Sequence, residues 1–181
     1  AEAGVDGIIA VSAGAGGHAG TINPFVLVHE IREVFDGVIL LAGGLSKGED
    51  LLAAQAMGAD LCYLGTRFIN TTESRAEAAY QNMIIEAVSG DIIHTPAVSG
   101  IPANFMRQSL EAAGYPMDKL NQAGELNYGD KLKPVDDEAK AWKTVWSAGQ
   151  GVSQITDVVS VSDLVGRIGD EYRSARARLC E

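Results

Sequence analysis

The chain has 181 residues, of which 46% are hydrophobic, and it carries a formal net charge of −10. This apolar content supports a buried core and excludes an intrinsically disordered protein. The acidic excess argues against nucleic acid as a partner, because a phosphate backbone recruits Lys and Arg. No apolar run reaches the roughly 20 residues that span a bilayer, and two cysteines cannot make a disulfide-rich scaffold. Composition therefore predicts a soluble, cytoplasmic protein without a membrane segment.

The N-terminal part of the chain predicts a strand–loop–helix unit that starts almost at once. An apolar run at residues 5–11 is typical of a parallel strand covered on both faces. A glycine-rich loop follows, and then a helix with Asn23 as its N-cap and Pro24 as its first residue. Because domains rarely begin inside such a unit, we expect further residues in front of Ala1.

A second unit of the same kind follows directly. It has a strand at residues 38–42, a glycine pair and a helix. Ser46 and Glu49 have the spacing of a capping box at the start of this helix, and Gly58 predicts its C-terminal stop.

The third unit has a strand at residues 60–64, a glycine turn and a helix near residues 73–88. Cys62 lies in the apolar strand, and we expect it to be a small residue of the core. Repeated units of this kind indicate a parallel α/β sheet, either doubly wound or closed into a barrel. A complete (β/α)8 TIM barrel takes about 250 residues, so a barrel interpretation makes these three βα units its C-terminal part.

The rest of the chain changes in character. Residues 91–145 are rich in turns and prolines and predict a small, mainly helical subdomain, with a polar helix near residues 136–146. Residues 146–181 begin with another glycine loop and end in a helix that we expect Ser162 to cap. We therefore divide the chain into three regions, the first of which is residues 1–90.

The glycine loops of the three units all follow strands, so a parallel sheet gathers them at one edge, where active sites of such folds lie. Gly43, Gly44, Gly65 and Thr66 suit phosphate binding. Glycine lets the backbone approach a ligand, and N–H groups at the start of a helix favour an anion. Each glycine could equally do no more than make a tight turn, and the sequence leaves both interpretations open.

His18 is the sharpest candidate for a catalytic side chain. It lies in a loop of glycines and alanines at residues 14–20, which leaves room for a substrate. An imidazole changes its protonation near neutral pH, as a general base requires. The alternative is a structural or surface histidine, which is our interpretation of His29 and His94. The loop lacks the spacing of a dinucleotide-binding motif, and the three histidines lack metal-ligand spacing.

Two further polar residues adjoin glycine loops. Ser147 either hydrogen-bonds a ligand or is an ordinary turn residue, since no nucleophile-elbow motif surrounds it. Arg67 follows the Gly65–Thr66 turn and either faces a phosphate or makes a surface ion pair.

Six short motifs stand in a fixed order along the chain: Gly-Val-Asp-Gly-Ile-Ile at 4–9, Ala-Gly-Gly-His-Ala-Gly at 15–20, Ala-Gly-Gly-Leu at 42–45, Ala-Met-Gly-Ala-Asp at 56–60, Gly-Thr-Arg-Phe at 65–68 and Trp-Ser-Ala-Gly-Gln at 146–150. Their order and spacing resemble the nitronate monooxygenase family, formerly called 2-nitropropane dioxygenases. The joint pattern is specific for the FMN-barrel superfamily and less so for one reaction. The resemblance extends over almost the whole chain.

The resemblance implies an FMN-binding (β/α)8 barrel with a smaller helical substrate domain. The strands of this chain would then be the sixth, seventh and eighth of that barrel. Many members have Gln or Asp at the end of the sixth strand, where this chain has Val11, so a flavin contact from that position is not implied. By the same resemblance His18 is the catalytic base. The implied FMN contacts are Gly16, Gly17, Gly43, Gly44, Tyr63, Leu64, Gly65, Thr66 and Ser147.

The implied reaction is oxidation of alkyl nitronates by O2 to carbonyl compounds and nitrite, with FMN carrying out the redox chemistry. His18 would remove the α-proton where a neutral nitroalkane is the substrate. Residues 91–135 would cover the site and select the alkyl chain.

Four other interpretations stay open. One is a flavin-dependent enoyl-ACP reductase and another an NAD(P)H:quinone reductase, both of the same barrel superfamily. The other two are not catalytic: a module that only binds a phosphate-bearing ligand, and a fragment that is inactive without an N-terminal half. A three-stranded piece leaves its first strand with an unpaired edge, so we expect either a separate N-terminal half or a second copy of the chain as a partner.

Overall fold

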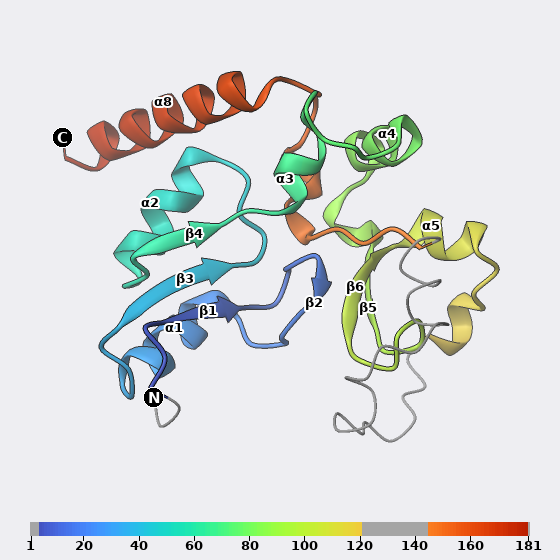
Figure 1. Cartoon of the computed structure of the whole chain (residues 1–181), viewed down its shortest axis with the longest axis horizontal. Coiled ribbons are helices and arrows are strands. Elements are labelled where there is room, and N and C mark those ends of the chain that lie inside the picture. Colours follow the sequence, from blue (N-terminus) through green and yellow to red (C-terminus); the bar gives the residue numbers. More distant parts are fainter. Residues whose placement is uncertain (1–3, 121–144, 181) are drawn as a thin grey trace.

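The computed structural model describes residues 4–120 and 145–180 and contains two small sheets that lie side by side (Figure 1). The first sheet is parallel and has the strand order β1-β3-β4. The second is antiparallel and has the order β2-β6-β5. The strands are β1 (Gly7–Val11), β2 (Gly17–His18), β3 (Val38–Ala42), β4 (Leu61–Tyr63), β5 (Ile92–Thr95) and β6 (Ala103–Met106).

Helices cover one face of the parallel sheet. Helix α1 (Pro24–Arg32) follows β1, and the Asn23 side chain caps it by accepting a hydrogen bond from the N–H of Phe25, as the sequence predicted. Helix α2 (Gly48–Ala56) follows β3. The buried core between these helices and the sheet consists of Ala10, Val28, Ile39, Leu41, Ala54 and Ala59.

The opposite face of the parallel sheet carries exposed apolar side chains. Residues paired in register point to the same face, so Ile9, Leu40 and Leu61 form one row across the three strands. Val11, Ala42 and Tyr63 form the next row toward the carboxyl ends. Exposure reaches 51% at Ile9, 54% at Leu61 and 55% at Tyr63. We call these two rows the uncovered sheet face.

The start of α2 differs from the prediction. The carboxylate of Asp50 accepts hydrogen bonds from the N–H groups of Ser46 and Lys47, so Asp50 and not Glu49 closes the first turn. The hydroxyl of Ser46 donates instead to the carbonyl oxygen of Gly151, 3.1 Å away. The predicted capping box is wrong because a tertiary partner takes the serine hydroxyl. Gly58 ends the helix segment with φ +103°, as predicted.

The predicted third helix is shorter and begins later. A single turn, α3 (Thr66–Ile69), follows β4 directly, and α4 spans Ala78–Glu86. Thr71 and Thr72 lie between these helices. Thr71 forms a parallel β-bridge with Val159, and the N–H of Thr72 donates to the carbonyl oxygen of Val159. This extended pairing prevents the helix from starting at residue 73.

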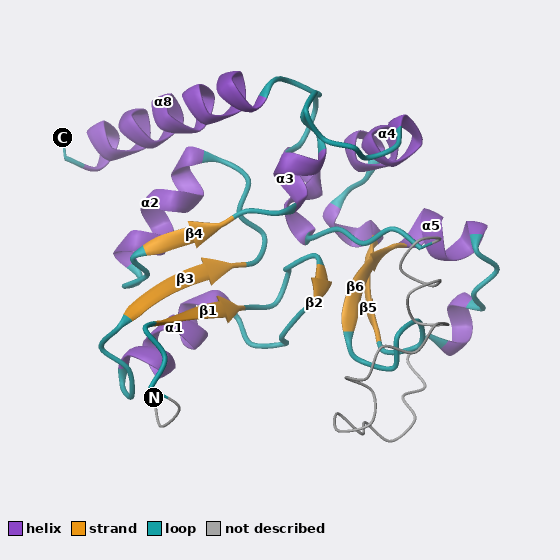
Figure 2. Ribbon diagram, viewed as in Figure 1, coloured by secondary structure: helices purple, strands orange, loops and turns teal. Residues whose placement is uncertain are grey.

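The region predicted as mainly helical begins with strands. β5 and β6 pair antiparallel with His94 opposite Asn104, and helix α5 (Arg107–Ala112) follows them (Figure 2). A short 3₁₀ turn, Met117–Lys119, comes next. The polar helix predicted near residues 136–146 falls almost entirely outside the described residues.

The long C-terminal helix α8 (Val161–Leu179) runs beside α2 (Figure 1). Its N-cap is Ser160, whose hydroxyl accepts a hydrogen bond from the N–H of Asp163, so the predicted cap at Ser162 is two residues off. The N–H of Gly48 donates to the Glu171 carboxylate at 2.8 Å. A Cβ on Gly48 would stand 2.2 Å from the backbone nitrogen of Tyr172, so this close helix contact requires glycine.

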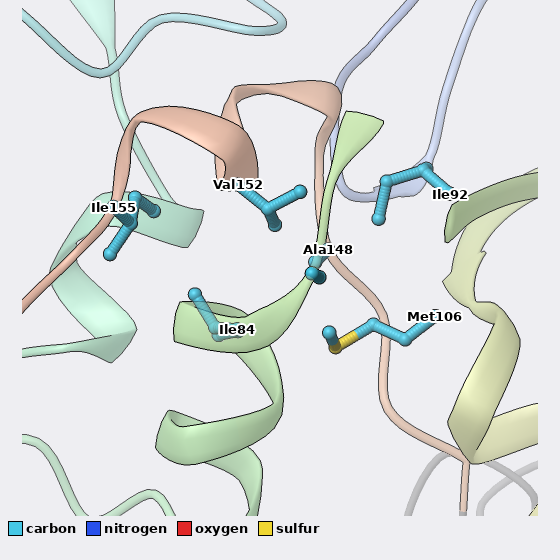
Figure 3. Close-up of a cluster of buried hydrophobic side chains, with 7 residues drawn as sticks. Ile84, Ile92, Met106, Ala148, Val152 and Ile155 are labelled. Atoms are coloured by element: carbon cyan, nitrogen blue, oxygen red, sulfur yellow. The ribbon is translucent and has the colours of Figure 1, made fainter. Parts of the chain in front are cut away.

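A second buried cluster lies between α4, β6 and the segment that follows residue 145. Figure 3 shows these side chains converging from separate parts of the chain. The segment includes the 3₁₀ helix Gln150–Gln154. The packing fixes the position of Trp146 and Ser147 relative to the sheets. The buried members are Ile84, Ala87, Ile92, Met106, Ala148, Val152 and Ile155. Within the described residues, no helix is long and apolar enough to cross a membrane.

Candidate functional site

The carboxyl ends of the three parallel strands open onto a cavity of about 480 Å³. This volume lies in the usual range of small-molecule and cofactor sites. The cavity lies at the carboxyl end of the uncovered sheet face. Of the residues predicted for a site, those lining it are Gly16, His18, Gly43, Gly44, Tyr63, Gly65, Thr66 and Ser147. Gly17 and Leu64 adjoin these residues in sequence but do not line the cavity.

The turn after β3 presents bare backbone to this cavity. Gly43 and Gly44 have φ values of +132° and +73°, which residues with side chains rarely adopt. A Cβ on Gly43 would stand 2.3 Å from the hydroxyl oxygen of the buried Ser12, so the turn packs tightly on that side. A Cβ on Gly44 would meet no atom within 4 Å. The open space over Gly44 is therefore room for a ligand against the backbone.

The turn after β4 has the same character. A Cβ on Gly65 would also meet no atom within 4 Å. The hydroxyl of the next residue, Thr66, accepts a hydrogen bond from the N–H of Gly149 at 2.9 Å. Gly16 packs close to this pair, because a Cβ on it would stand 2.8 Å from the nitrogen of Gly149. Three separate segments thus meet at one wall of the cavity.

His18 is exposed and ends the short strand β2, which pairs with β6. The N–H of the following residue, Ala19, donates to the carbonyl oxygen of Pro102 at 3.4 Å. His18 lines the main cavity and also a second cavity of about 360 Å³, which Ile101 and Pro102 help to line. Val11 is the other residue common to both cavities. His18 therefore borders two adjacent cavities.

Ser147 is held in place through its backbone. Its carbonyl oxygen accepts a short hydrogen bond from the hydroxyl of Tyr80, and the residue bridges Phe105 of β6. Burial raises the pKa of Tyr80 to about 12, although the hydrogen bond to Ser147 opposes this shift. The Tyr80 ring also stacks on Trp146 with centroids 5.0 Å apart. Ser147 thus lines the cavity from a well-packed segment.

Arg67 does not line either cavity. Its side chain is 4% exposed and pairs with the carboxylate of Asp157 at 2.9 Å. Burial lowers the pKa of the Arg67 guanidinium, and the charge of Asp157 opposes that shift. Of the two interpretations from sequence, the ion pair is therefore the one observed, with the guanidinium buried and the Asp157 side chain 34% exposed.

The other two histidines lie elsewhere. His29 is exposed on α1, and Nδ1 of His94 lies 3.0 Å from the amide oxygen of Asn104. In residues 4–120 and 145–180, no group of three or more His, Cys, Asp or Glu is placed to hold a metal ion.

Sequence reasoning missed several residues of the cavity wall. Ser46 was assigned to a helix cap, whereas its hydroxyl fixes the Gly151 segment across the cavity. Gly149 and Gly151 belong to a loop that the sequence had marked, and their glycine content was the available signal. The lining residues not predicted are Ile9, Val11, Gly14, Ala15, Ala42, Leu45, Ser46, Ile69, Gly149 and Gly151.

The wall consists of glycine backbone and apolar side chains, with few polar side chains. Bare backbone suits a phosphate, because N–H groups can approach an anion closely. Apolar walls suit a planar ring system. The cavity therefore suits a ligand that has both a phosphate group and a planar ring system.

Comparison with known proteins identifies the family of this chain. Residues 1–171 match the sequence family described as nitronate monooxygenase. The chain belongs to the nitronate monooxygenase family, whose members are flavin-dependent oxidoreductases. A nitronate monooxygenase of Paraburkholderia phytofirmans is 32% identical over 121 residues, which cover 62% of this chain and 33% of that protein.

Two solved structures that are more than 25% identical to this chain share its fold. The nitroalkane oxidase of Streptomyces ansochromogenes matches with a TM-score of 0.78 and 28% identity, over 98% of this chain and 55% of that chain. FabK of Thermotoga maritima matches with a TM-score of 0.74 and 26% identity, over 98% of this chain and 58% of that chain. The α/β fold is thus similar to these TIM-barrel enzymes, and the chain spans just over half the length of each.

Proposed function

We propose that this chain carries the FMN site and the catalytic base of a nitronate monooxygenase. The reaction oxidises alkyl nitronates, and nitroalkanes after deprotonation, by O2 to carbonyl compounds and nitrite. The observation that carries the proposal is that His18 and the turns after β3 and β4 line one cavity. Family membership supports flavin chemistry in general, and the bare glycine walls favour a cofactor with a phosphate.

The residues that would hold FMN follow from the wall of the main cavity. The backbone at Gly43, Gly44, Gly65 and Thr66 would hold the phosphate, because both turns line the cavity and a Cβ on Gly44 or Gly65 would meet no atom within 4 Å. Gly16, Tyr63 and Ser147 line the same cavity and would contact the rest of the cofactor, with Gly17 and Leu64 beside them in the sequence. The bound flavin supplies the electron acceptor for the reaction.

The second cavity is the place for the substrate. His18 lines both cavities, so a nitroalkane seated in the second one would have its α-carbon near the imidazole. The imidazole takes the α-proton from a neutral nitroalkane, and a nitronate has already lost it. Ile101 and Pro102 line this cavity from the loop between β5 and β6, which fits the expected covering role of residues 91–145.

Replacing the base tests the proposal. His18→Asn keeps a polar side chain of smaller size, so we expect FMN binding to change less than threefold. Turnover of a neutral nitroalkane falls by about 10²–10⁴-fold, the usual contribution of a general base. Turnover of the pre-formed nitronate falls much less. His29→Asn on the exposed face of α1 is the matched control and leaves both rates unchanged. Equal losses on both substrates for His18→Asn would remove the base role.

The similarity to FabK keeps a flavin-dependent enoyl-ACP reductase or NAD(P)H:quinone reductase as the second candidate. These enzymes consume NAD(P)H, whereas nitronate oxidation does not need it. Anaerobic mixing of the FMN-loaded protein with NADH separates the two. Slow or absent flavin bleaching supports the nitronate assignment, and rapid bleaching contradicts it.

The proposal includes a partner that completes a barrel around the cavity. The uncovered sheet face holds rows of apolar side chains, and β1 and β4 are the edges of the described parallel sheet. Exposed strand edges recruit further strands. We expect the N-terminal half of such a barrel to cover this face, so that β1, β3 and β4 correspond to its last three parallel strands.

The isolated chain tests this part. Residues 1–181 alone should bind FMN weakly and elute from gel filtration as an associated species. Addition of the N-terminal half of a family relative should restore the flavin absorbance of a bound cofactor. A stable, yellow monomer of residues 1–181 would contradict the need for a partner, and a chain that stays colourless with its complement would favour an inactive fragment.

A further inference from the structure

Asn104 lies inside β6 and connects two segments that are far apart in the sequence. It is 3% exposed, and its amide nitrogen donates to the carbonyl oxygen of Ala15 at 2.7 Å. Its amide oxygen lies 3.0 Å from Nδ1 of His94, the residue directly opposite on β5. Both polar ends of this buried amide therefore have partners, and one of them is the glycine loop that carries His18.

The chemistry of the partners fixes the orientation of the amide. A carbonyl oxygen can only accept, so the Asn104 nitrogen must face Ala15. The amide oxygen then faces His94, which donates through Nδ1 in the tautomer that protonates that atom. Rotating the amide by 180° would place two acceptors 2.7 Å apart at Ala15. His94 thus holds Asn104 in the only orientation that binds the loop.

Strand β6, which carries Asn104, contacts two separate segments that line the main cavity. Its backbone pairs with β2, with Gly17 opposite Asn104, and its Phe105 bridges Ser147. The loop of residues 14–20 is otherwise built of small residues, which give it little packing of its own. Its backbone is held by the two-residue pairing of β2, by the N–H of Gln150, which donates to the carbonyl oxygen of Gly14, and by the bond from Ala19 to Pro102. The bond from Asn104 to Ala15 adds a side-chain restraint three residues from His18.

We propose that Asn104 is a positioning residue that sets the place of the His18 imidazole, and that His94 orients it. Removing the restraint leaves His18 present but mobile, which lowers the rate of a step that needs close alignment. The catalytic consequence rests on the proposed function, whereas the positioning itself does not depend on flavin or substrate.

The sharpest variant is Asn104→Asp, which keeps the size of the side chain. Its carboxylate still accepts from His94 but sets an acceptor against the Ala15 carbonyl. We expect hydrogen exchange of the backbone amides at residues 14–19 to accelerate at least tenfold, while the amides of Ile39 and Leu41 in β3 stay unchanged. Unchanged exchange in the loop, or an equal rise in β3, would overturn the proposal.

His94 gives a second and milder pair of variants. His94→Leu removes the donor and should also accelerate exchange in the loop, whereas His94→Gln offers an amide N–H and should restore slow exchange. The proton NMR signals of the three histidines add a spectroscopic readout, since the His18 ring signal should shift in Asn104→Asp while that of His29 does not. Identical behaviour of the Leu and Gln variants would remove the orienting role of His94.

Enzyme kinetics are the last test of the proposal. With FMN, a nitroalkane and the N-terminal half of a family relative as complement, Asn104→Asp should lower kcat at least tenfold and change KM less than threefold. If the complemented wild-type protein shows no turnover, the proposed function fails, and the exchange measurement still decides the positioning role. If turnover is normal in Asn104→Asp although the loop is mobile, the alignment claim is wrong.

Discussion

The hydroxyl of Thr66 accepts a hydrogen bond from the backbone N–H of Gly149, although 83 positions separate the two residues. This bond joins the turn after β4 to the segment that begins at residue 145. The N–H of Gln150 donates to the carbonyl oxygen of Gly14 beside it, at 2.9 Å. Three glycine-rich segments are thereby fixed to one another around the main cavity.

Thr66→Val tests how much this junction contributes. Valine has the shape of threonine but cannot accept, so the N–H of Gly149 loses its partner in a largely buried place. We expect the free energy of unfolding to fall by about 1–3 kcal/mol, the usual cost of such a group. Chemical denaturation followed by circular dichroism measures it. Thr66→Ser keeps the acceptor and should cost much less; equal losses for both variants would mean that the methyl group and not the hydrogen bond matters.

Gly65→Val tests the placement of the cofactor. Gly65 has φ −105° and no atom within 4 Å of a built Cβ, so the substitution causes no clash inside the protein. The added side chain fills ligand space instead, and we expect FMN affinity to fall at least tenfold in an absorbance titration while stability changes little. Gly90→Val is the matched control, because Gly90 is equally open but lies outside the cavity. Unchanged flavin binding in Gly65→Val would refute the placement.

The ion pair of Arg67 predicts that replacing Asp157 lowers the stability more than replacing Arg167 does. Asp157 lies between Arg67 at 2.9 Å and Arg167 at 2.8 Å, and the side chains of these arginines are 4% and 43% exposed. Asp157→Asn leaves the buried guanidinium without its counter-charge and should cost about 2–4 kcal/mol. Arg167→Gln removes only an exposed partner and should cost less than about 1 kcal/mol. Urea denaturation compares them, and similar losses would contradict the importance of burial.

Cys62 should react slowly with thiol reagents. Burial, with the charge of Asp50 adding to it, raises the pKa of this thiol to about 11 from 9.0. The thiolate is the reactive form, so alkylation by iodoacetamide at pH 8 should be about 100-fold slower in the folded than in the unfolded chain. The folded-state rate should rise about tenfold per pH unit up to pH 11. Mass spectrometry follows the modification, with the exposed Cys180 as an internal reference. Equal rates for Cys62 in folded and unfolded protein would contradict this shift.

Local signals in the sequence located much of the parallel sheet and its turns. The apolar runs gave β1, β3 and β4, and the Asn23–Pro24 pair gave the start of α1, because each depends on residues within a few positions of one another. The glycines of the strand-end turns were equally legible. That these turns meet at one cavity follows from the parallel arrangement, since all carboxyl ends then lie at the same edge.

Only the tertiary structure decided the features that depend on distant partners. β5 and β6 form because they pair with each other and with the glycine loop, a pairing that turn-rich sequence does not announce. Ser46 bonds Gly151 across 105 positions, and Arg67 meets Asp157 across 90. A hydroxyl or guanidinium has the same local pattern whichever partner it finds. Composition and spacing therefore determined the strands and the glycine turns, while long-range hydrogen bonds and burial decided which polar side chains line the cavity and which support it.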